Sequence, residues 1–354
     1  MKNLLRILIV ATFLGIILYY TSVGENSSEV LKGPNIPTQA IPSTEVEKTS
    51  MYLPRPIEGV STLIGNDADL LLKQFGPPTR VEKSRYQYDW WVYVKDTELL
   101  MISVEDNKVT QVYTNSTKHN IAPYTIGQSL EEIYRMTIVE SEIAVTIDET
   151  IYLFLMNEVD LNTRLLVAFE DVLAQLYIDF ETNKLIGIRF IDGPTLVRHR
   201  PYEFQYIGEL IQHTVPSSFE QSTIDLAYAN QIYNLVNEFR LLNNVPKLLR
   251  SPLLNEIAMD HSEYMVLKDL NINAEEEIIP LESRLEEKNL IYKKMDENSA
   301  INYYDAIEAV HGWINSKEHR DVMYNNRYNI SGTGVYLNKY TQVYIEKETS
   351  IDYY

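Results

Sequence analysis

The sequence predicts an α+β protein with two folded domains, on the strength of three observations. Residues 64–76 and 126–134 each start with Ile-Gly, continue as a short amphipathic helix, and lead into runs rich in Tyr, Val and Ile that are typical of strands. From residue 222 the apolar residues recur at three- to four-residue spacing, which indicates long helices. A chain of 354 residues with 45% hydrophobic content is long and apolar enough to bury both cores.

The first 22 residues carry an export signal. Lys2 and Arg6 precede an apolar run over residues 7–20, and positive charge followed by an apolar core is the pattern of a signal sequence. No small-residue cleavage motif follows, and Tyr19 and Tyr20 are typical of a membrane interface. We expect an uncleaved signal anchor over 1–22, a single pass through the cell membrane, and extracellular domains. A secreted protein with a cleaved signal peptide is the alternative.

Residues 23–55 lack apolar periodicity and are rich in Ser, Thr, Pro, Gly, Asn and Glu. Such a segment cannot bury enough surface to fold alone. We therefore expect a disordered linker that holds the folded part away from the membrane.

Residues 56–200 are predicted to form a domain with an internal duplication. Asp67 and Ser129 stand at equivalent N-cap positions of the two short helices. Each half is expected to pack one helix on an antiparallel sheet, and neither half contains a catalytic constellation. Trp90 and Trp91 fall on opposite faces of one predicted strand, so one of them should meet a neighbouring domain, solvent or a ligand.

The composition excludes several classes of function. The net charge of -19 repels phosphate backbones and anionic lipid headgroups, so nucleic acid is not an expected partner, whereas a cation is easier to accommodate. The chain has no Cys, which excludes disulfides, thiolate metal sites, Cys nucleophiles and the lipid-attachment Cys of a bacterial lipoprotein.

Residues 222–347 are predicted to form the second domain. One helix ends at the Asn-Asn-Val-Pro run of 243–246, and a second spans about 251–268 with His261 on its inward stripe, where a structural role is the more frequent one. A further helix starts at Asp305, where D-x-x-E over 305–308 makes a capping arrangement.

The order of motifs in this region resembles a bacterial CAP domain, the superfamily of cysteine-rich secretory proteins, antigen 5 and pathogenesis-related 1 proteins. The motifs are HSEYM at 261–265, EN at 297–298, WINSKEHR at 313–320 and SGTGVY at 331–336. The resemblance covers about residues 225–347 and implies a three-layer α-β-α sandwich, with 332–336 and 341–345 as its closing strands. Residues 56–200 likewise resemble the CAP-associated domain of Bacillus-type exported proteins of Gram-positive bacteria.

The resemblance also implies a cleft built around a His/Glu cluster, which this chain keeps only in part. Glu297 corresponds to the first cluster carboxylate, and His319 to a histidine of bacterial relatives. Asn273 stands where the first cluster histidine is expected, Ser316 where animal relatives place a second carboxylate, and Lys339 where they place a second histidine.

Metal binding is an open expectation at this cluster. Glu297 and His319 are the candidate ligands for zinc or calcium, and Asn273 is a poor ligand for a transition metal beside imidazole. The carboxylates of 275–277 offer oxygen ligands for calcium, although such a run is more often a solvated loop.

Three functions remain open on the sequence. The first is a non-enzymatic, membrane-anchored surface protein that binds a lipid, a peptide or a surface protein in or beside the cleft, with the middle domain covering it. The second is a metal-assisted, peptidase-like hydrolase with Glu297 as general base and His319 as the polarising or metal-holding group. The third is an envelope scaffold without a cleft ligand.

Overall fold

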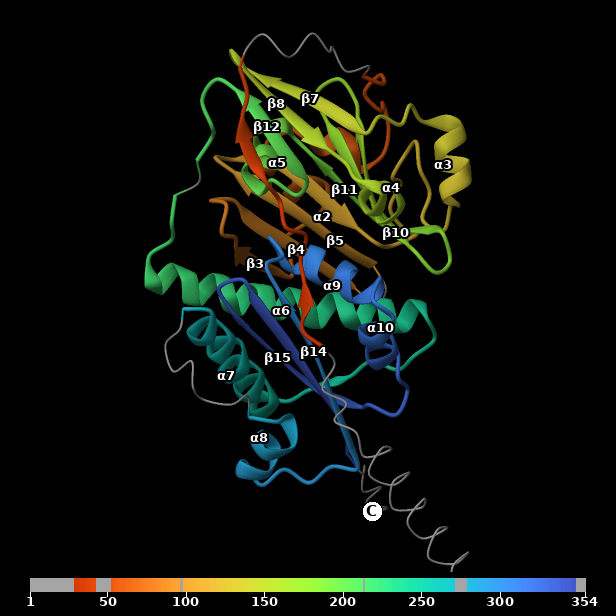
Figure 1. Cartoon of the computed structure of the whole chain (residues 1–354). Helices are drawn as coiled ribbons and strands as arrows, with labels where there is room; N and C mark the ends of the chain where they lie inside the picture. The colour runs from red at the N-terminus through yellow and green to blue at the C-terminus, as the bar shows by residue number, and fades with distance from the viewer. Residues whose placement is uncertain (1–28, 43–51, 96–97, 213, 271–278, 348–354) are drawn as a thin grey trace, which may run out of the picture.

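The structure, a computed structural model, describes residues 29–42, 52–95, 98–212, 214–270 and 279–347. The expected anchor over 1–22 and Asn273 lie outside the described residues. Figure 1 shows two domains stacked on one another, with the long helix α6 (Ser218–Leu242) running across the middle between the N-terminal sheets and the C-terminal sheet.

The N-terminal domain is built on a seven-stranded antiparallel sheet with the order β3-β4-β5-β6-β11-β10-β9. Its strands are β3 (Arg80–Lys83), β4 (Asp89–Lys95), β5 (Glu98–Glu105), β6 (Lys108–Thr114), β9 (Arg164–Ala168), β10 (Leu173–Asp179) and β11 (Lys184–Ile191). The two halves of the domain do not form separate sheets, because β6 of the first half pairs with β11 of the second. This pairing satisfies the backbone groups of two strands that would otherwise be edges.

The internal duplication is confirmed by equivalent contacts in the two halves. Helices α2 (Ala68–Phe75) and α3 (Leu130–Met136) each follow a glycine with positive φ. The amide of Gly65 donates to Val109 O at 2.8 Å, and the amide of Gly127 donates to Leu185 O at 2.7 Å. The two hairpins that these bonds reach, β5–β6 and β10–β11, each contain a register irregularity.

A second, four-stranded sheet of the N-terminal domain has the order β2-β12-β8-β7. Its strands are β2 (Thr38–Ala40), β7 (Glu142–Ile147), β8 (Thr150–Leu155) and β12 (Glu203–Ile207). The remaining helices of this domain are η1 (Val60–Leu63), α4 (Glu158–Thr163) and α5 (Gly193–His199). Of these, α4 connects the second sheet to the edge strand β9, and its C-cap residue Arg164 forms an ion pair with Glu308 of the C-terminal domain.

The C-terminal domain has the predicted three layers. Its sheet has the order β1-β14-β16-β15-β13, with the strands β1 (Leu31–Lys32), β13 (Leu249–Arg250), β14 (Lys294–Ile301), β15 (Ile330–Tyr336) and β16 (Lys339–Glu346). One face is covered by α7 (Pro252–Asp269) and α8 (Leu281–Glu287), and the other by α6, α9 (Ala306–Ile314) and α10 (Lys317–Met323). The two faces of the sheet belong to separate hydrophobic clusters: Val343 packs with α7 and α8, whereas Tyr344 packs with α6 and α9.

The expectation of a disordered linker over 23–55 is wrong for residues 29–42, which we call the strap. Leu31 and Lys32 pair in parallel with Ala300 and Ile301 of β14, and residues 38–40 pair in parallel with β12. The strap therefore adds an edge strand to a sheet of each domain. Its composition failed to predict this because edge pairing uses backbone hydrogen bonds and requires no apolar periodicity of its own.

The two domains share one hydrophobic core. Trp90 of β4 is fully buried in it, together with α6 and α9 of the C-terminal domain, while Trp91 packs against the separate core of the N-terminal domain. Of the three partners left open for these Trp side chains, a neighbouring domain, solvent or a ligand, Trp90 meets the neighbouring domain.

Candidate functional sites on the two faces of the C-terminal sheet

Glu297 is held by an arginine on the α7–α8 face of the sheet. Nη2 of Arg284, in α8, lies 2.7 Å from both carboxylate oxygens of Glu297, and both side chains are buried. His261 of α7 is close by, with its Nε2 3.9 Å from Glu297 Oε1. Burial lowers the pKa of His261 to about 4, with the charge of Arg284 acting in the same direction and that of Glu297 opposing it. The imidazole is therefore neutral near pH 7.

A small pocket of about 150 Å³ opens beside this cluster. Its walls include His261, Tyr264, Arg284 and Lys288. The two cationic groups here are already paired, since Arg284 holds Glu297 and Lys288 lies 2.6 Å from Glu256. The pocket is therefore small and bordered by ion pairs, and it is too small for a substrate of drug-like size.

His319 lies on the opposite face of the same sheet. Neighbouring residues in a strand point to opposite faces, and Asn298, next to Glu297 in β14, donates from Nδ2 to the backbone oxygen of His319 at 2.9 Å. Nδ1 of His319 is 2.8 Å from the hydroxyl of Ser316. Burial lowers the pKa of His319, while Glu318 and the backbone at Glu29 and Ser299 act in the opposite sense.

The structure therefore brings two of the selected candidates, Ser316 and His319, together and leaves Glu297 apart from them. Glu297 faces α7 and α8, whereas His319 and Ser316 lie with α10 on the other side of the sheet. Lys339, at the position of a family histidine, is buried and forms an ion pair with Asp269. In the part of the chain that the structure describes, no three His, Asp or Glu side chains are grouped so that they could hold a metal ion.

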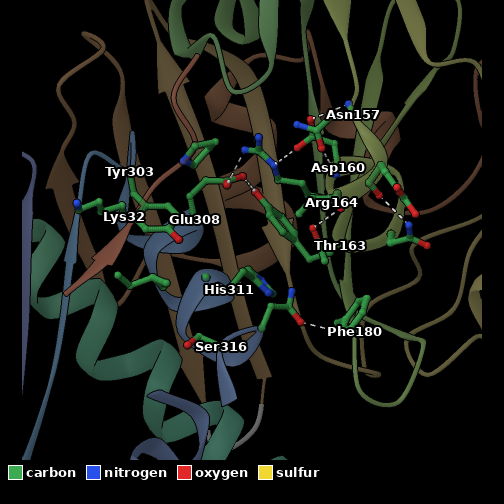
Figure 2. Close-up of a pocket in the computed structure, with 18 of the residues that line it drawn as sticks. Lys32, Asn157, Asp160, Thr163, Arg164, Phe180, Tyr303, Glu308, His311 and Ser316 are labelled. Atoms are coloured by element: carbon green, nitrogen blue, oxygen red, sulfur yellow. Dashed lines mark hydrogen bonds and ion pairs between the residues drawn. The ribbon is translucent and has the colours of Figure 1, made fainter. Parts of the chain in front are cut away.

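A much larger pocket, of about 700 Å³, lies between the two domains. Figure 2 shows Asn157, Asp160 and Thr163 on one side of it and Tyr303, His311 and Ser316 on the other. We call it the interdomain pocket, and its walls come from α4, the end of β10, the segment that includes α9, and the strap. Its volume is within the range of sites that enclose small molecules.

The polar wall of the interdomain pocket is built around Glu308 of α9. Glu308 Oε1 accepts hydrogen bonds from Gln175 at 2.8 Å, Tyr177 at 2.9 Å and Tyr304 at 3.0 Å. Its Oε2 lies 3.3 Å from Nη1 of Arg164, and Figure 2 shows the two side chains next to one another. These four donors come from both domains, so they hold the carboxylate in one position and join the domains at the same time.

His311 lies one turn further along α9 and is also fixed from the N-terminal domain. Its Nε2 is 2.9 Å from the hydroxyl of Tyr113, and its ring stacks on Tyr177 with a centroid separation of 4.0 Å. Burial lowers the pKa of His311 well below its ordinary value, and Arg189 adds to the effect. The ring is therefore a neutral, aromatic part of the pocket wall.

The charges that line the interdomain pocket do not favour an anion. Arg164 is committed to Glu308 and to Asp160, whose Oδ1 lies 2.7 Å from its Nε. Glu158 adds a further carboxylate at the rim, and Lys32 adds one ammonium group.

Exposed Val159 and Phe180 provide apolar surface at the entrance of the interdomain pocket. The lining suits a neutral or cationic molecule with an apolar part.

Of the residues that line this pocket, the sequence motifs selected only Ser316, although a signal for others was present. Asp305, Glu308, His311 and Asn315 recur at spacings of three to four residues along a helix whose other positions are mostly apolar. A polar stripe on a buried helix indicates a polar partner surface. The spacing of this stripe does not identify the sheet residues that contact Glu308 and His311.

Comparisons with known proteins agree with the two-domain architecture. Residues 64–202 match the family described as CAP-associated N-terminal, and residues 233–347 match the Cysteine-rich secretory protein family. The membrane protein YlbC of Bacillus subtilis is 33% identical over 352 residues, which cover 98% of this chain and all of YlbC. The chain belongs to the CAP family.

Two solved structures share the fold of this CAP protein. An extracellular protein with an SCP domain from Bacillus anthracis is 31% identical, with a TM-score of 0.76 over 85% of this chain and all of that one. A cysteine-rich secretory protein from Staphylococcus aureus is 25% identical, with a TM-score of 0.74 over 90% of this chain and all of that one. Within the described residues, no helix combines the length and apolar character that a membrane span requires.

Proposed function

We propose that this CAP protein is an extracellular, membrane-anchored binding module, and that its ligand occupies the interdomain pocket. The observation that carries the proposal is the pocket of about 700 Å³ whose polar wall is held in place by hydrogen bonds from both domains. A preformed, largely apolar pocket with a few fixed polar groups is the usual form of a small-molecule site. The expected ligand is a small, partly apolar molecule that is neutral or positively charged.

Anchoring is the second part of the proposal. It is supported by the positive charge and apolar run of residues 1–22 and by the name of the Bacillus subtilis relative, which describes a membrane protein. Residues 29–347 then lie outside the cell and, because the chain has no Cys, are stabilised there without disulfides.

The cluster at Glu297 supports a structural role and not a base or a metal ligand. Its carboxylate is already neutralised by Arg284, and the nearest imidazole, His261, is neutral and 3.9 Å away. A general base needs a free carboxylate within reach of a substrate proton. For the same reason we propose no bound zinc or calcium at Glu297 and His319, which lie on opposite faces of the sheet.

One observation favours a hydrolase as the second candidate. The hydroxyl of Ser316 lies 2.8 Å from Nδ1 of His319, which is a typical distance between a nucleophile and its base. Ser316 also borders the interdomain pocket. The carboxylate of Glu318 acts on this imidazole through its charge, and the other groups that act on it are backbone groups at Glu29 and Ser299. We expect no covalent labelling by a fluorophosphonate probe. Labelling of the wild type that is lost in Ser316→Ala would instead support the hydrolase.

The binding proposal is tested with Nile red, a neutral apolar dye, and a matched pair of variants. Val159 on α4 is 66% exposed at the pocket entrance, and Leu72 on α2 is 43% exposed far from it. Val159→Trp should weaken dye binding at least tenfold because the larger ring fills the entrance, and Leu72→Trp should leave it unchanged. Equal affinity of both variants for the dye would contradict the proposal.

A further inference from the structure

The strap, residues 29–42, forms one wall of the interdomain pocket. Leu31, Lys32, Pro34 and Asn35 line the pocket directly. On one side of the pocket, the strap is attached to the C-terminal sheet through β1. On the other side, it is attached to the N-terminal domain through β2. A ligand that leaves or enters on this side must pass the strap.

The attachment of the strap is weak compared with the walls opposite to it. None of the residues 29–42 is fully buried, and all three residues of β2 are exposed. The strap is held by two short parallel pairings, with bonds such as Gly33 N to Ile301 O at 2.8 Å and Ile41 N to Tyr206 O at 3.0 Å, and by the half-buried Leu31, which packs against the shared core. Segments with few buried apolar contacts and exposed backbone bonds are the first to open in folded proteins.

The wall formed by α9 has the opposite character. Its groups Asp305 and Glu308 are buried and bonded to the N-terminal domain, and α9 lies in the core that the two domains share. Opening the pocket on that side would expose paired charges and a large apolar core, at a cost of many kcal/mol. The strap is therefore the wall that can move at the lowest free-energy cost.

We propose that the strap is a gate, which detaches from β14 as a unit to admit and release the ligand of the interdomain pocket. This inference rests on the proposed function. Gly33 allows the strap to lie close against the C-terminal domain, because a Cβ at this position would lie 2.6 Å from the backbone oxygen of Asn302. Detachment leaves the two domains joined through α9 and the shared core, so the pocket opens without separation of the domains.

The test exploits the absence of Cys from the chain. Lys32 and Ile301 are register partners in β1 and β14, so the variant Lys32→Cys/Ile301→Cys can be locked by oxidation and released by reduction. Thr146→Cys/Ile151→Cys, at register partners in β7 and β8, is the matched control. Stopped-flow association of Nile red should slow at least tenfold in the locked gate, recover on reduction, and remain unchanged in the control.

A second variant tests the gate in the opposite direction. Gly33→Ala should unseat the strap and speed Nile red association several-fold, whereas Gln39→Ala, at an exposed position of β2, should not. Hydrogen exchange at the Gly33 and Ile41 amides should be faster than at the amides of β16 that pair with β14.

The outcomes separate the gate from the pocket itself. If the locked and reduced forms bind the dye at the same rate while Val159→Trp still weakens binding, the gate is wrong and the pocket stands. If Val159→Trp also binds normally, both inferences fail together. Exchange of the strap amides only through global unfolding would overturn the gate on its own.

Discussion

The carboxylate of Asp305 in the CAP domain lies 2.7 Å from the guanidinium of Arg189 in the CAP-associated domain, and both side chains are completely buried. Asp305 also accepts a hydrogen bond from Glu308 N at the start of α9. The first turn of one helix is therefore tied to β11 of the other domain by a buried ion pair. This contact places Glu308 and His311 against the seven-stranded sheet.

Breaking this ion pair should strongly destabilise the protein. Asp305→Asn keeps a helix-capping side chain but leaves Arg189 charged and unpaired, which should lower the free energy of unfolding by about 3 kcal/mol. The double variant Arg189→Met/Asp305→Asn removes both charges and should recover most of this loss. Urea unfolding of the four proteins in the cycle measures both effects. Additive losses in the double variant would show that the pair is not coupled.

Glu297 should matter for stability and not for metal binding. Glu297→Gln leaves the buried Arg284 without its charged partner, and we expect a loss of about 3 kcal/mol in the free energy of unfolding. Glu346→Gln is the matched control, because its partner Arg327 is 58% exposed and such a pair contributes little. Zinc and calcium titrations followed by native mass spectrometry should not distinguish Glu297→Gln from the wild type. A metal lost in this variant alone would contradict the structural role.

Stability should fall as the pH is lowered from about 6.5 towards 4, partly through His261. Its pKa in the folded protein is about 4 because of burial, below the ordinary value near 6.5. In this window the unfolded chain binds the proton more readily than the folded one, so acidification favours unfolding, by about 3 kcal/mol at most for this group. His261→Gln should flatten the unfolding free energy over this pH range. His119→Gln, at a half-buried histidine, should flatten it less.

The close contact between α7 and β15 should tolerate no side chain at Gly334. A Cβ at this position would lie 2.0 Å from the backbone nitrogen of Met259, so Gly334→Ala must push the helix off the sheet. We expect a loss of at least about 3 kcal/mol. Ser331→Ala, at a buried position of the same strand, should cost much less. A melting temperature for Gly334→Ala equal to that of Ser331→Ala would contradict this contact.

The fold could be predicted from the sequence where the pattern is local. The helix signals at Asp67 and Ser129 and the alternation of the strands led to the duplicated domain, and the motif order at 297–336 led to the sandwich. The strap could not be predicted, because edge strands of two or three residues form by pairing with the exposed edge of a sheet. They are too short to show a hydrophobic periodicity in the sequence.

The site was harder to predict than the fold for a physical reason. Glu297 and His319 were selected together because they belong to one family motif set, but strand alternation at Glu297 and Asn298 sends them to opposite faces of the sheet. The interdomain pocket depends on pairs such as Tyr177 with Glu308, which are 131 residues apart in the chain. The spacing of residues within one element cannot predict such a pair.

The measurement that tests the central claim most directly is native mass spectrometry of the full-length chain, exported by a Gram-positive host and released in mild detergent. We expect a small-molecule adduct on the wild type, Leu72→Trp and Glu297→Gln, and its loss or marked depletion in Val159→Trp. An adduct that persists in Val159→Trp and disappears in Glu297→Gln would place the ligand at the α7–α8 face. That result, or a wild type with neither an adduct nor saturable Nile red binding, would contradict the account.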